Sequence, residues 1–391
     1  MRILYHHRTR GDGAEGIHIN EMISAFEELD NTVRLVCPKN SRRPLGISLG
    51  LSGIDSNQTK TFIGKLKIVL LQFAEILYNA ISIPRLFWAC LRFQPDFIYE
   101  RYSCYHIAGA IVSSVLRIPL VLEVNSTYSG RFNRRALSFP NIHRMFENFA
   151  FSASARICVV TQALRDCVLD RGVSANRILV TTNCINPKLL VNDTERRFEV
   201  RKQLSIPGDA TVFGFVGSLR RWHGIEILLE IIPSILKRVE NCFFLIVGSG
   251  ELDTEVSEMV SANGIRSSVI LTGGVEHSKV ASFICAMDIC LQPDSNEWCS
   301  PMKLLEYMVQ GKACVAPRMP NIQEIIIEGE TGLLFEKLNP SDLEKTLVYL
   351  AGETAVRNKL GVQSQRYVLE NRTWKVNARS VLESLGPGCT Y

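Results

Sequence analysis

The residues best suited to chemistry gather in one segment of the second half of the chain, from Ser300 to Glu306. Ser300 and Pro301 form a good pair for starting a helix, since serine caps free N–H groups and proline fits the first turn. Lys303 and Glu306 then lie three residues apart on one helical face, while Leu304 turns inward. Helix starts attract anions, so the segment predicts a phosphate site. The same two charges could instead form a surface ion pair.

Two further motifs of the second half could bind the same kind of ligand. Arg220 and Arg221 stand between a predicted strand and an apolar helix over residues 225–239, where arginines could hold a diphosphate or could simply be solvated bases. A glycine-rich turn with Gly248 and Gly250 follows the next strand and would let the backbone approach a base or a ribose.

The first strand leads into a glycine loop that matches G-x-G-x-x-G literally, with glycines at 11, 13 and 16. We expect a helix to begin near Ile17, and free N–H groups at its start favour an anion. A dinucleotide site needs a carboxylate about 20 residues later, and none ends the second strand. A dehydrogenase is therefore the weaker interpretation.

The elements that must position these motifs alternate regularly. Apolar, β-branched runs are separated by helical patterns, which is typical of parallel sheets wrapped by helices. We expect strands at residues 2–5, 33–37, 97–100, 120–124, 157–160, 178–182, 211–217, 242–247, 269–272, 289–292, 313–316 and 332–335. The fold class is α/β, with two doubly wound units whose ligand crevices face one central cleft.

After Pro187 the sequence becomes polar and charged, and this change divides the chain into domains. Residues 1–188 form the first predicted domain, residues 189–370 the second, and 371–391 a C-terminal helix and tail that cross back to the first domain. Residues 39–61 read as a long loop, which at that length is more often functional than idle.

Charge and composition limit the possible partners. The formal charge of +5 divides into +9 for residues 1–188 (23 basic, 14 acidic) and −4 for the remainder (21 basic, 25 acidic). Without basic blocks, this favours an anionic small ligand or membrane surface over a nucleic acid, or an ordinary solvated surface. The 12 cysteines form no C-x-x-C pair, and no Asp-x-Asp or ligand-spaced His/Cys group occurs, so we expect no metal. The cysteine pattern and the strand-like N-terminus favour the cytoplasm.

The most membrane-like stretch is Ile63 to Phe93, but charged residues interrupt it and its uninterrupted apolar runs are shorter than the ~20 residues of a span. Two interpretations stay open. The stretch is a pair of helices facing the core, or an amphipathic surface that rests on a bilayer through Trp88 and its neighbours.

The order of motifs resembles the family 4 glycosyltransferases of the GT-B fold, and the resemblance covers nearly the whole chain. The motifs that carry it are the glycine loop, residues 119–125, 160–161, 180–183, 215–217, 247–250 and 300–308, Glu324, and residues 329–334. It implies an N-terminal acceptor domain and a C-terminal nucleotide-sugar domain. It also implies retaining transfer of a sugar without a cofactor. The Ser-Pro-x-Lys-x-x-Glu-Tyr-Met form is similar to a bacterial branch linked to exopolysaccharide or cell-surface glycan assembly.

The resemblance also assigns roles to residues. Glu306 matches the family's ribose ligand, while the donor-sugar carboxylate is displaced, because Trp298 occupies its place and Glu297 lies one residue early. The family's two cations after the first strand fall on Ser218 and His223. Diphosphate binding then passes to Arg220, Arg221 or Lys303.

On the acceptor side, Asn125 stands where many relatives have a histidine. Glu123 or His18 is then expected to position or deprotonate the acceptor hydroxyl. Glu123 is preferred, since a carboxylate among Leu122 and Val124 is costly to bury without a task. Gly16, Gly248, Gly250, Ser300 and Leu304 complete the expected donor contacts.

Two other functions remain open on the same fold. A nucleotide-sugar 2-epimerase would need acid and base groups aimed at the donor sugar, and a non-catalytic nucleotide-sugar-binding protein would fit the altered Glu and cation positions. We expect a cytoplasmic enzyme, peripheral on the inner membrane face, whose acceptor is a glycan or a lipid-linked sugar.

Overall fold

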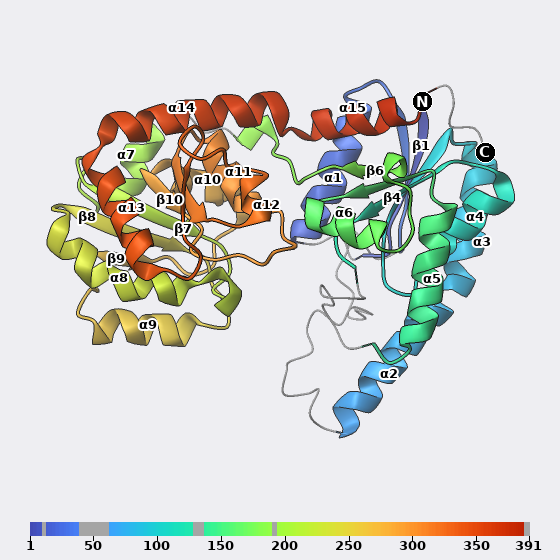
Figure 1. Ribbon diagram of the computed structural model, residues 1–391, viewed down its shortest axis with the longest axis horizontal. Helices are drawn as coiled ribbons and strands as arrows, with labels where there is room; N and C mark the ends of the chain where they lie inside the picture. The colour runs from blue at the N-terminus through green and yellow to red at the C-terminus, as the bar shows by residue number, and fades with distance from the viewer. Residues whose placement is uncertain (10–12, 39–61, 128–136, 190–193, 387–391) are drawn as a thin grey trace. The chain divides into compact units, whose positions relative to one another are not determined.

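The computed structural model describes residues 1–9, 13–38, 62–127, 137–189 and 194–386 and divides into two compact units (Figure 1). Unit 1 contains Met1–Thr182 and Trp374–Tyr391, and unit 2 contains Asn183–Thr373. The predicted loop at residues 39–61 lies outside the described residues. Each unit has a parallel sheet of six strands with helices on its faces, which confirms two Rossmann-like α/β domains.

In unit 1 the elements run β1 (Arg2–His6), α1 (Gly13–Glu27), β2 (Thr32–Val36), α2 (Phe62–Leu77), α3 (Asn79–Phe93), β3 (Phe97–Arg101), α4 (Ala108–Leu116), β4 (Leu120–Val124), α5 (Pro140–Ala153), β5 (Arg156–Val159), α6 (Gln162–Leu169), η3 (Ala175–Arg177), β6 (Ile178–Val180) and, from the end of the chain, α15 (Trp374–Ser384). The sheet order is β2-β1-β3-β4-β5-β6. All five residues of β3 and of β4 are buried, as expected for central strands covered on both faces.

In unit 2 the elements run η4 (Pro187–Leu189), α7 (Thr194–Gln203), β7 (Thr211–Val216), η5 (Arg221–His223), α8 (Ile225–Arg238), β8 (Cys242–Val247), α9 (Asp253–Ala262), β9 (Val269–Leu271), α10 (His277–Cys285), β10 (Ile289–Leu291), α11 (Met302–Val309), β11 (Ala313–Pro317), α12 (Pro320–Gln323), β12 (Leu333–Phe335), α13 (Pro340–Gly352) and α14 (Thr354–Asn371). The sheet order is β12-β11-β10-β7-β8-β9. One core packs α8, α9 and α13 on the sheet, and the other packs α11, α12 and α14 on its opposite face.

The strand orders fix where each unit can hold a ligand. In unit 1 the chain leaves β1 for β2 on one side and continues with β3 on the other, and in unit 2 it leaves β7 for β8 and returns to β10. Helices on either side of such a reversal diverge, so a crevice opens at the carboxyl ends of the two strands. The switch points are therefore β1/β3 in unit 1 and β7/β10 in unit 2.

Each predicted strand is present in the described residues, with ends displaced by no more than a few residues. Some helix predictions were wrong in detail. The first helix begins at Gly13 rather than near Ile17, so Gly16 is a buried residue inside α1 and not part of a loop. Other helix predictions were confirmed: the segment Ile63–Phe93 is a pair of helices, as one of its two interpretations expected, and the C-terminal region is helical, with α14 followed by α15.

The boundary between the units lies before Asn183, earlier than the change of character expected at residue 188. Asn183 and Ile185 already belong to unit 2, because Asn183 donates to Ser300 and the backbone N–H of Ile185 donates to the carbonyl of Arg372. The chain returns to unit 1 at Trp374. There Asn377 donates to the carbonyl of Thr182.

Candidate active site

The switch point of unit 2 brings the loop after β7 against the loop after β10. The backbone N–H of Asp294 donates to the carbonyl of His223 at 3.1 Å, and a Cβ added at Gly224 would lie 2.7 Å from that of Asp294. Gly224 has a φ of 68°, which glycine adopts without strain. The loop that carries Arg220 and Arg221 and the loop that leads into α11 therefore lie side by side.

Lys303 lies at the centre of this site. Its Nζ is buried, has no hydrogen-bond partner among the described residues, and lies 4.5 Å from the centre of the Phe215 ring. A Cβ added at Gly217 would come within 2.6 Å of that nitrogen. Burial lowers the pKa of Lys303 to about 7, against the opposing effect of the Glu306 carboxylate. An unpaired buried amine is costly unless a ligand supplies the counter-charge.

The glycines after β7 and β8 let the two loops touch. A Cβ at Gly248 would lie 2.0 Å from the carbonyl oxygen of Gly217, and one at Gly250 would lie 2.4 Å from that of Leu219. Gly248 also has a φ of 138°, outside the range of other residues. Both predicted glycines are therefore required by the close approach of backbone to backbone, and they border the switch point.

Ser300 does not cap α11 as expected. The residue before the helix is Pro301, and the Ser300 hydroxyl accepts instead from the backbone N–H of Asn183 at 3.1 Å. The first N–H groups of α11 are therefore left without a side-chain cap. Leu304 is fully buried in the core of unit 2, so its side chain contacts no ligand, and only its backbone lies in the first turn of α11.

Glu306 lies on the face of α11 that looks toward α10. It borders a small hollow of about 10 Å³ that is also lined by His277 and Gln310. Burial raises the pKa of Glu306, and the charges of His277 and Lys303 oppose the rise. Among the described residues, Lys303 and Glu306 form no ion pair within 4.0 Å, so the surface pair considered from the sequence is not formed.

The two predicted arginines differ in their surroundings. Arg221 is exposed and its guanidinium is held by both carboxylate oxygens of Glu255, at 2.9 and 3.0 Å, and by Glu226 at 3.5 Å. Arg220 is exposed, and its side chain has no partner in the part of the chain that the structure describes. Glu297 is exposed in the loop between β10 and α11.

The switch point of unit 1 holds a buried network around Glu123. Its Oε1 accepts from Arg101 Nη1 and from Asn125 Nδ2, and its Oε2 accepts from the Tyr5 hydroxyl at 3.3 Å. His18 Nδ1 lies 3.5 Å from the same carboxylate. Burial alone would raise the pKa of Glu123, but these neighbouring charges and hydrogen bonds hold it below its ordinary value.

His18 is buried in the same network. Its ring lies 4.5 Å from the indole of Trp374 in an edge-to-face arrangement. Burial lowers the pKa of His18 to about 4, with Arg101 acting in the same direction against Glu123. The structure thus brings the two predicted acceptor residues together, but it ties them to Arg101 and leaves Glu123 only 1% exposed.

Sequence reasoning missed three partners of these residues. Arg101 ends β3 and lies beside Glu123 in the parallel register. Phe215 looks like an ordinary core residue of β7 in the sequence, but its ring lies against the amine of Lys303. Glu100 meets His6 across β1 and β3. The pairing of strands was the missing information, since the residues involved are far apart in the sequence.

Comparisons with known proteins identify the family of the chain. The family model described as "Glycosyltransferase Family 4" matches residues 15–189, and "Glycosyl transferases group 1" matches residues 210–353. A glycosyltransferase of Methanocaldococcus jannaschii is 27% identical over 74% of this chain and 76% of its own. The lipopolysaccharide 1,2-N-acetylglucosaminetransferase of Salmonella typhimurium is 24% identical over 65% of this chain and 68% of its own.

Among solved structures, Anabaena HepE in complex with UDP superposes with a TM-score of 0.72 at 16% identity, over 98% of this chain and 99% of HepE. At that identity the likeness concerns the fold. Together with the two family models, which between them span most of the chain, it gives one conclusion: the chain belongs to the family 4 glycosyltransferases and is an enzyme of the GT-B fold.

Proposed function

We propose that the chain transfers a sugar from a nucleotide-sugar donor, with retention at the anomeric carbon, to a glycan or lipid-linked acceptor in cell-surface or exopolysaccharide assembly. The observation that carries the proposal is the unpaired, buried amine of Lys303 at the β7/β10 switch point. A diphosphate is the counter-charge that fits this place. HepE, which shares the fold, has been solved with UDP.

In the proposed reaction, the bond between the anomeric carbon and the diphosphate oxygen breaks, and its electron pair leaves with the diphosphate. The acceptor hydroxyl forms the new carbon–oxygen bond on the same face. The protonated amine of Lys303, the uncapped N–H groups at the start of α11 and the free guanidinium of Arg220 stabilise the departing charge. No metal is needed for this step.

The remaining donor contacts follow from the same site. Glu306, on the helix that carries Lys303, is proposed to accept hydrogen bonds from the ribose hydroxyls, and the backbone at Gly248 and Gly250 to lie along the nucleotide. Exposed Glu297 is proposed to contact the donor sugar. Arg221 is already neutralised by Glu255, so we assign it no part in diphosphate binding.

On the acceptor side, we propose that Glu123 and His18 act as positioning residues. A carboxylate that is 1% exposed and bound by Arg101 cannot easily take a proton from a hydroxyl. Its ionised form instead fixes Arg101 at the carboxyl end of β3. This revises the sequence-based expectation of a general base.

Two assays test the function. A thermal-shift screen across UDP, GDP, ADP and their sugars should show one base that raises the melting temperature, since a ligand of the native state stabilises it by mass action. Incubation with labelled nucleotide sugars then separates the alternatives. Transfer to an acceptor supports the proposal, an isomerised donor would indicate an epimerase, and unchanged donor with binding would indicate a non-catalytic protein.

A second observation supports attachment to a membrane. Helix α2 is packed with its polar side inward: Gln72 is fully buried and accepts from the Tyr105 hydroxyl at 2.8 Å, and Glu75 is 2% exposed and pairs with Arg8 at 3.3 Å. Its apolar side faces outward, with Leu70 59% and Phe73 50% exposed. A soluble helix normally has the opposite arrangement.

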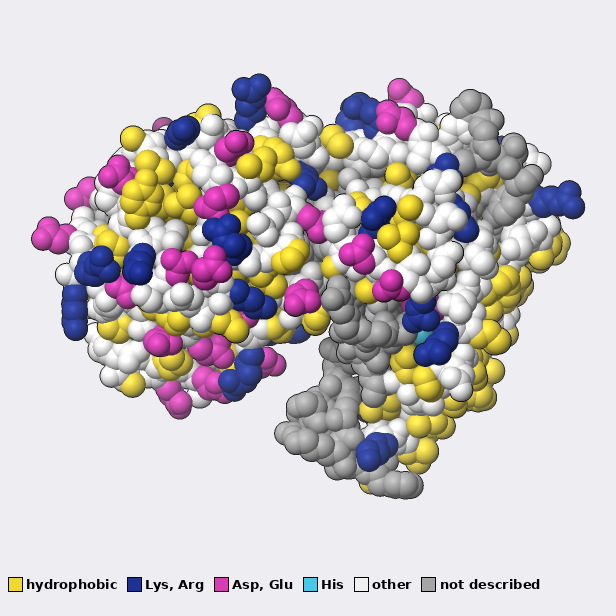
Figure 2. Space-filling view, in the orientation of Figure 1, with side chains coloured by type: hydrophobic (Ala, Val, Ile, Leu, Met, Phe, Trp, Pro, Cys, Tyr) yellow, Lys and Arg dark blue, Asp and Glu magenta, His cyan; other side chains and the backbone are white. Residues whose placement is uncertain are grey.

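The outward apolar side continues beyond α2. We define the apolar face by its exposed large side chains on α2, α3 and α5, namely Ile63, Leu66, Leu70, Phe73, Leu77, Ile81, Trp88, Leu91, Met145 and Phe149. Figure 2 shows hydrophobic side chains gathered over these helices at the lower right. By length and composition, Ile63–Phe93 is also sufficient to cross a membrane, and 22% of its most apolar window is buried. Leu86 and Cys90 of α3 are nevertheless buried, so α3 also has a side that faces the core.

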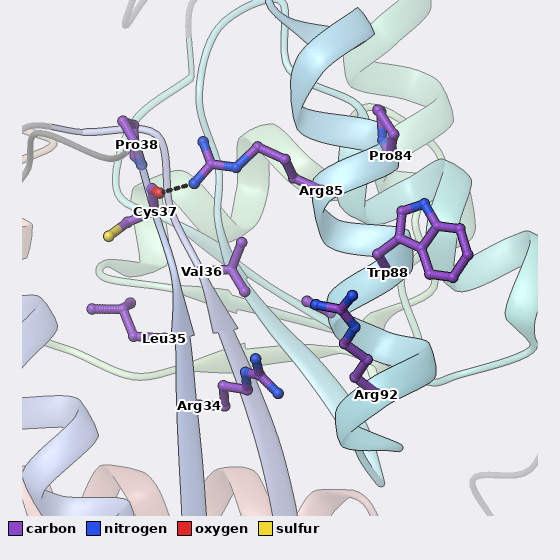
Figure 3. Close-up of a pocket in the computed structure, with 10 residues that line it drawn as sticks. Arg34, Leu35, Val36, Cys37, Pro38, Pro84, Arg85, Trp88 and Arg92 are labelled. Atoms are coloured by element: carbon purple, nitrogen blue, oxygen red, sulfur yellow. Dashed lines mark hydrogen bonds between the residues drawn. The ribbon is translucent and has the colours of Figure 1, made fainter.

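A basic groove adjoins this face between β2 and α3 (Figure 3). It has a volume of about 720 Å³, and Arg34, Arg85 and Arg92 line it together with Trp88. Arg85 also donates to the carbonyl of Cys37 at 2.7 Å. Each base near an anionic lipid surface adds about 1 kcal/mol to attachment, so the groove and the apolar face together fit an anionic leaflet.

We therefore propose a cytoplasmic enzyme that rests on the inner leaflet and reaches lipid-linked acceptors there. Co-sedimentation with vesicles tests this. Binding that requires anionic lipid, falls in high salt and is reduced in Phe73→Ser supports the proposal, with Tyr349→Ser, an exposed aromatic change in unit 2, as control. Absence of binding to anionic vesicles at low salt would refute it.

A further inference from the structure

Three buried side chains of unit 1 meet beside the β1/β3 switch point and take no part in the proposed reaction. His6 ends β1, Glu100 lies opposite it in β3 in the parallel register, and His106 follows in the loop before α4. Their exposed fractions are only 3%, 2% and 3%. Two imidazoles and one carboxylate are a common donor set for zinc.

The ligand atoms are close enough to share an ion. His6 Nδ1 lies 2.5 Å and His106 Nε2 lies 3.9 Å from Glu100 Oε2, and all three atoms lie within 4.8 Å of one another. Zinc bonds of about 2.0–2.2 Å place ligand atoms roughly 3.3–3.6 Å apart in a tetrahedron. Shifts of less than about 1 Å would therefore complete the geometry.

His106 gives the second, independent observation. Neither of its ring nitrogens has a hydrogen-bond partner in the described part of the chain, although the side chain is buried. A buried polar group without a partner destabilises the native state.

The surroundings of the other two ligands fit the same role. Ser82 Oγ lies 3.3 Å from His6 Nε2, as in histidine ligands whose second nitrogen is held by an oxygen, and an ion at Nδ1 would replace the present contact between His6 and Glu100. The backbone N–H of Gly109 donates to Glu100 Oε2 at 2.9 Å. A Cβ at Gly109 would lie 2.5 Å from that carboxylate, so the glycine makes room for it.

We propose that His6, Glu100 and His106 bind a zinc ion, with water as the fourth ligand, and that this site fastens the loop between β3 and α4 to the carboxyl ends of β1 and β3. The ligands are His6 Nδ1, Glu100 Oε2 and His106 Nε2. The site is separate from the diphosphate site, which lies in unit 2. It departs from the expectation of no metal, which was based on spacing along the sequence.

The test measures zinc binding by the full chain after removal of metal with a chelator. We expect one zinc per chain, a melting temperature that rises with zinc, and, with Co²⁺ as probe, the visible absorption of a tetrahedral site. His106→Phe should fold as well as the native chain without metal, because the imidazole has no hydrogen bond to lose. It should lose more than about 100-fold in zinc affinity.

His143→Gln, a buried histidine of the same unit outside the cluster, is the matched control and should bind zinc normally. Glu100→Gln is a second ligand variant and should also weaken zinc binding. If the native chain binds no zinc at micromolar concentration, or if His106→Phe binds it as tightly as the native chain, the cluster is only an ion pair between His6 and Glu100 and the proposal is wrong.

Discussion

The two units differ in the arrangement of charges at their switch points, although their sheets have similar strand orders. In unit 1 the acidic and basic groups at the switch point neutralise one another, since Glu123 is bound by Arg101. In unit 2 the buried amine of Lys303 has no such partner within the described part of the chain. The strand orders differ only in how many strands lie on each side of the reversal.

The paired charges of unit 1 stabilise the fold, whereas the charge of Lys303 is placed to bind a ligand. A buried pair is costly to break, because the surviving partner is left without a counter-charge. A buried charge without a partner is costly as it stands, and its removal relieves the native state. Substitutions in the two units should therefore act on different quantities, with stability affected in unit 1 and donor chemistry in unit 2.

The largest effect is expected for Lys303→Met. Loss of the cation should lower kcat by about 10²- to 10³-fold, as for other groups that stabilise the departing charge, while the melting temperature stays equal or rises. Single-turnover kinetics and thermal unfolding measure the two quantities. Lys312→Met is the control: its Nζ donates to the carbonyls of Cys285 and Met287, so its loss should lower stability instead. Equal destabilisation by both variants would mean that Lys303, like Lys312, stabilises the fold, and would contradict the role assigned to its amine.

Glu123→Gln should act on stability. Leaving Arg101 buried without its carboxylate should cost about 3–5 kcal/mol of unfolding free energy, measured with denaturant. Because the native pKa of Glu123 is lowered, its contribution is present above the unfolded pKa of about 4.3 and is lost as the pH falls through the native value. The difference from the native chain should therefore shrink in acid. A variant of native stability with reduced transfer would restore Glu123 as a catalytic base.

Glu306→Gln should weaken donor binding by about 10- to 100-fold, because a charge-assisted hydrogen bond to the ribose is lost. Calorimetric titration with the nucleotide diphosphate measures the affinity. The uncharged side chain keeps the shape of the hollow beside His277, so stability should change little. Full affinity in a folded variant would contradict the ribose assignment.

The pH dependence of donor binding should report the lowered pKa of Lys303, which is about 7 in the free protein. Affinity should be highest below pH 7 and fall roughly tenfold as the amine loses its proton above it. Binding at pH 8 should then take up a proton, which calorimetry in buffers of different ionisation enthalpy detects. Lys303→Arg stays charged, so proton uptake should disappear. Uptake that persists in this variant would assign the proton to another group.

Arg221→Ala should have the smallest effect, less than about twofold on kcat and under about 1 kcal/mol on stability, since its partners Glu226 and Glu255 are on the surface. Arg220→Ala, with no ion pair to lose, should reduce kcat more. Steady-state kinetics of both variants show which loss of kcat is larger. A larger loss in Arg221→Ala would indicate that Arg221 binds the diphosphate.

The fold could be predicted closely because parallel strands leave a local signal. Buried runs such as Leu120–Val124 and Cys242–Val247 were placed at their observed limits. Helix starts were harder to predict from the sequence. Gly13 begins α1 among small and charged residues that carry no periodicity, and Ser300 resembles a cap although its hydroxyl is bound by Asn183.

The site could be predicted only as a set of candidates. Lys303 and Glu306 were found from their position at a helix start, but the separation of Arg221 from Arg220 depends on Glu255, thirty-four residues further along the chain. The partnership of Glu123 with Arg101 depends on strand pairing. Contacts between residues far apart in the sequence decide which charges have partners, and such contacts leave no local pattern in the sequence.

The return of the chain to unit 1 at Trp374 has a consequence for the order of synthesis. The ribosome produces α1 near the start, but α15, whose Trp374 ring packs on His18, emerges only after the whole of unit 2. Unit 2 is continuous and has all its residues available before that point. Unit 2 can therefore complete its fold first, while unit 1 must wait, with one side of α1 uncovered, until α15 has left the exit tunnel.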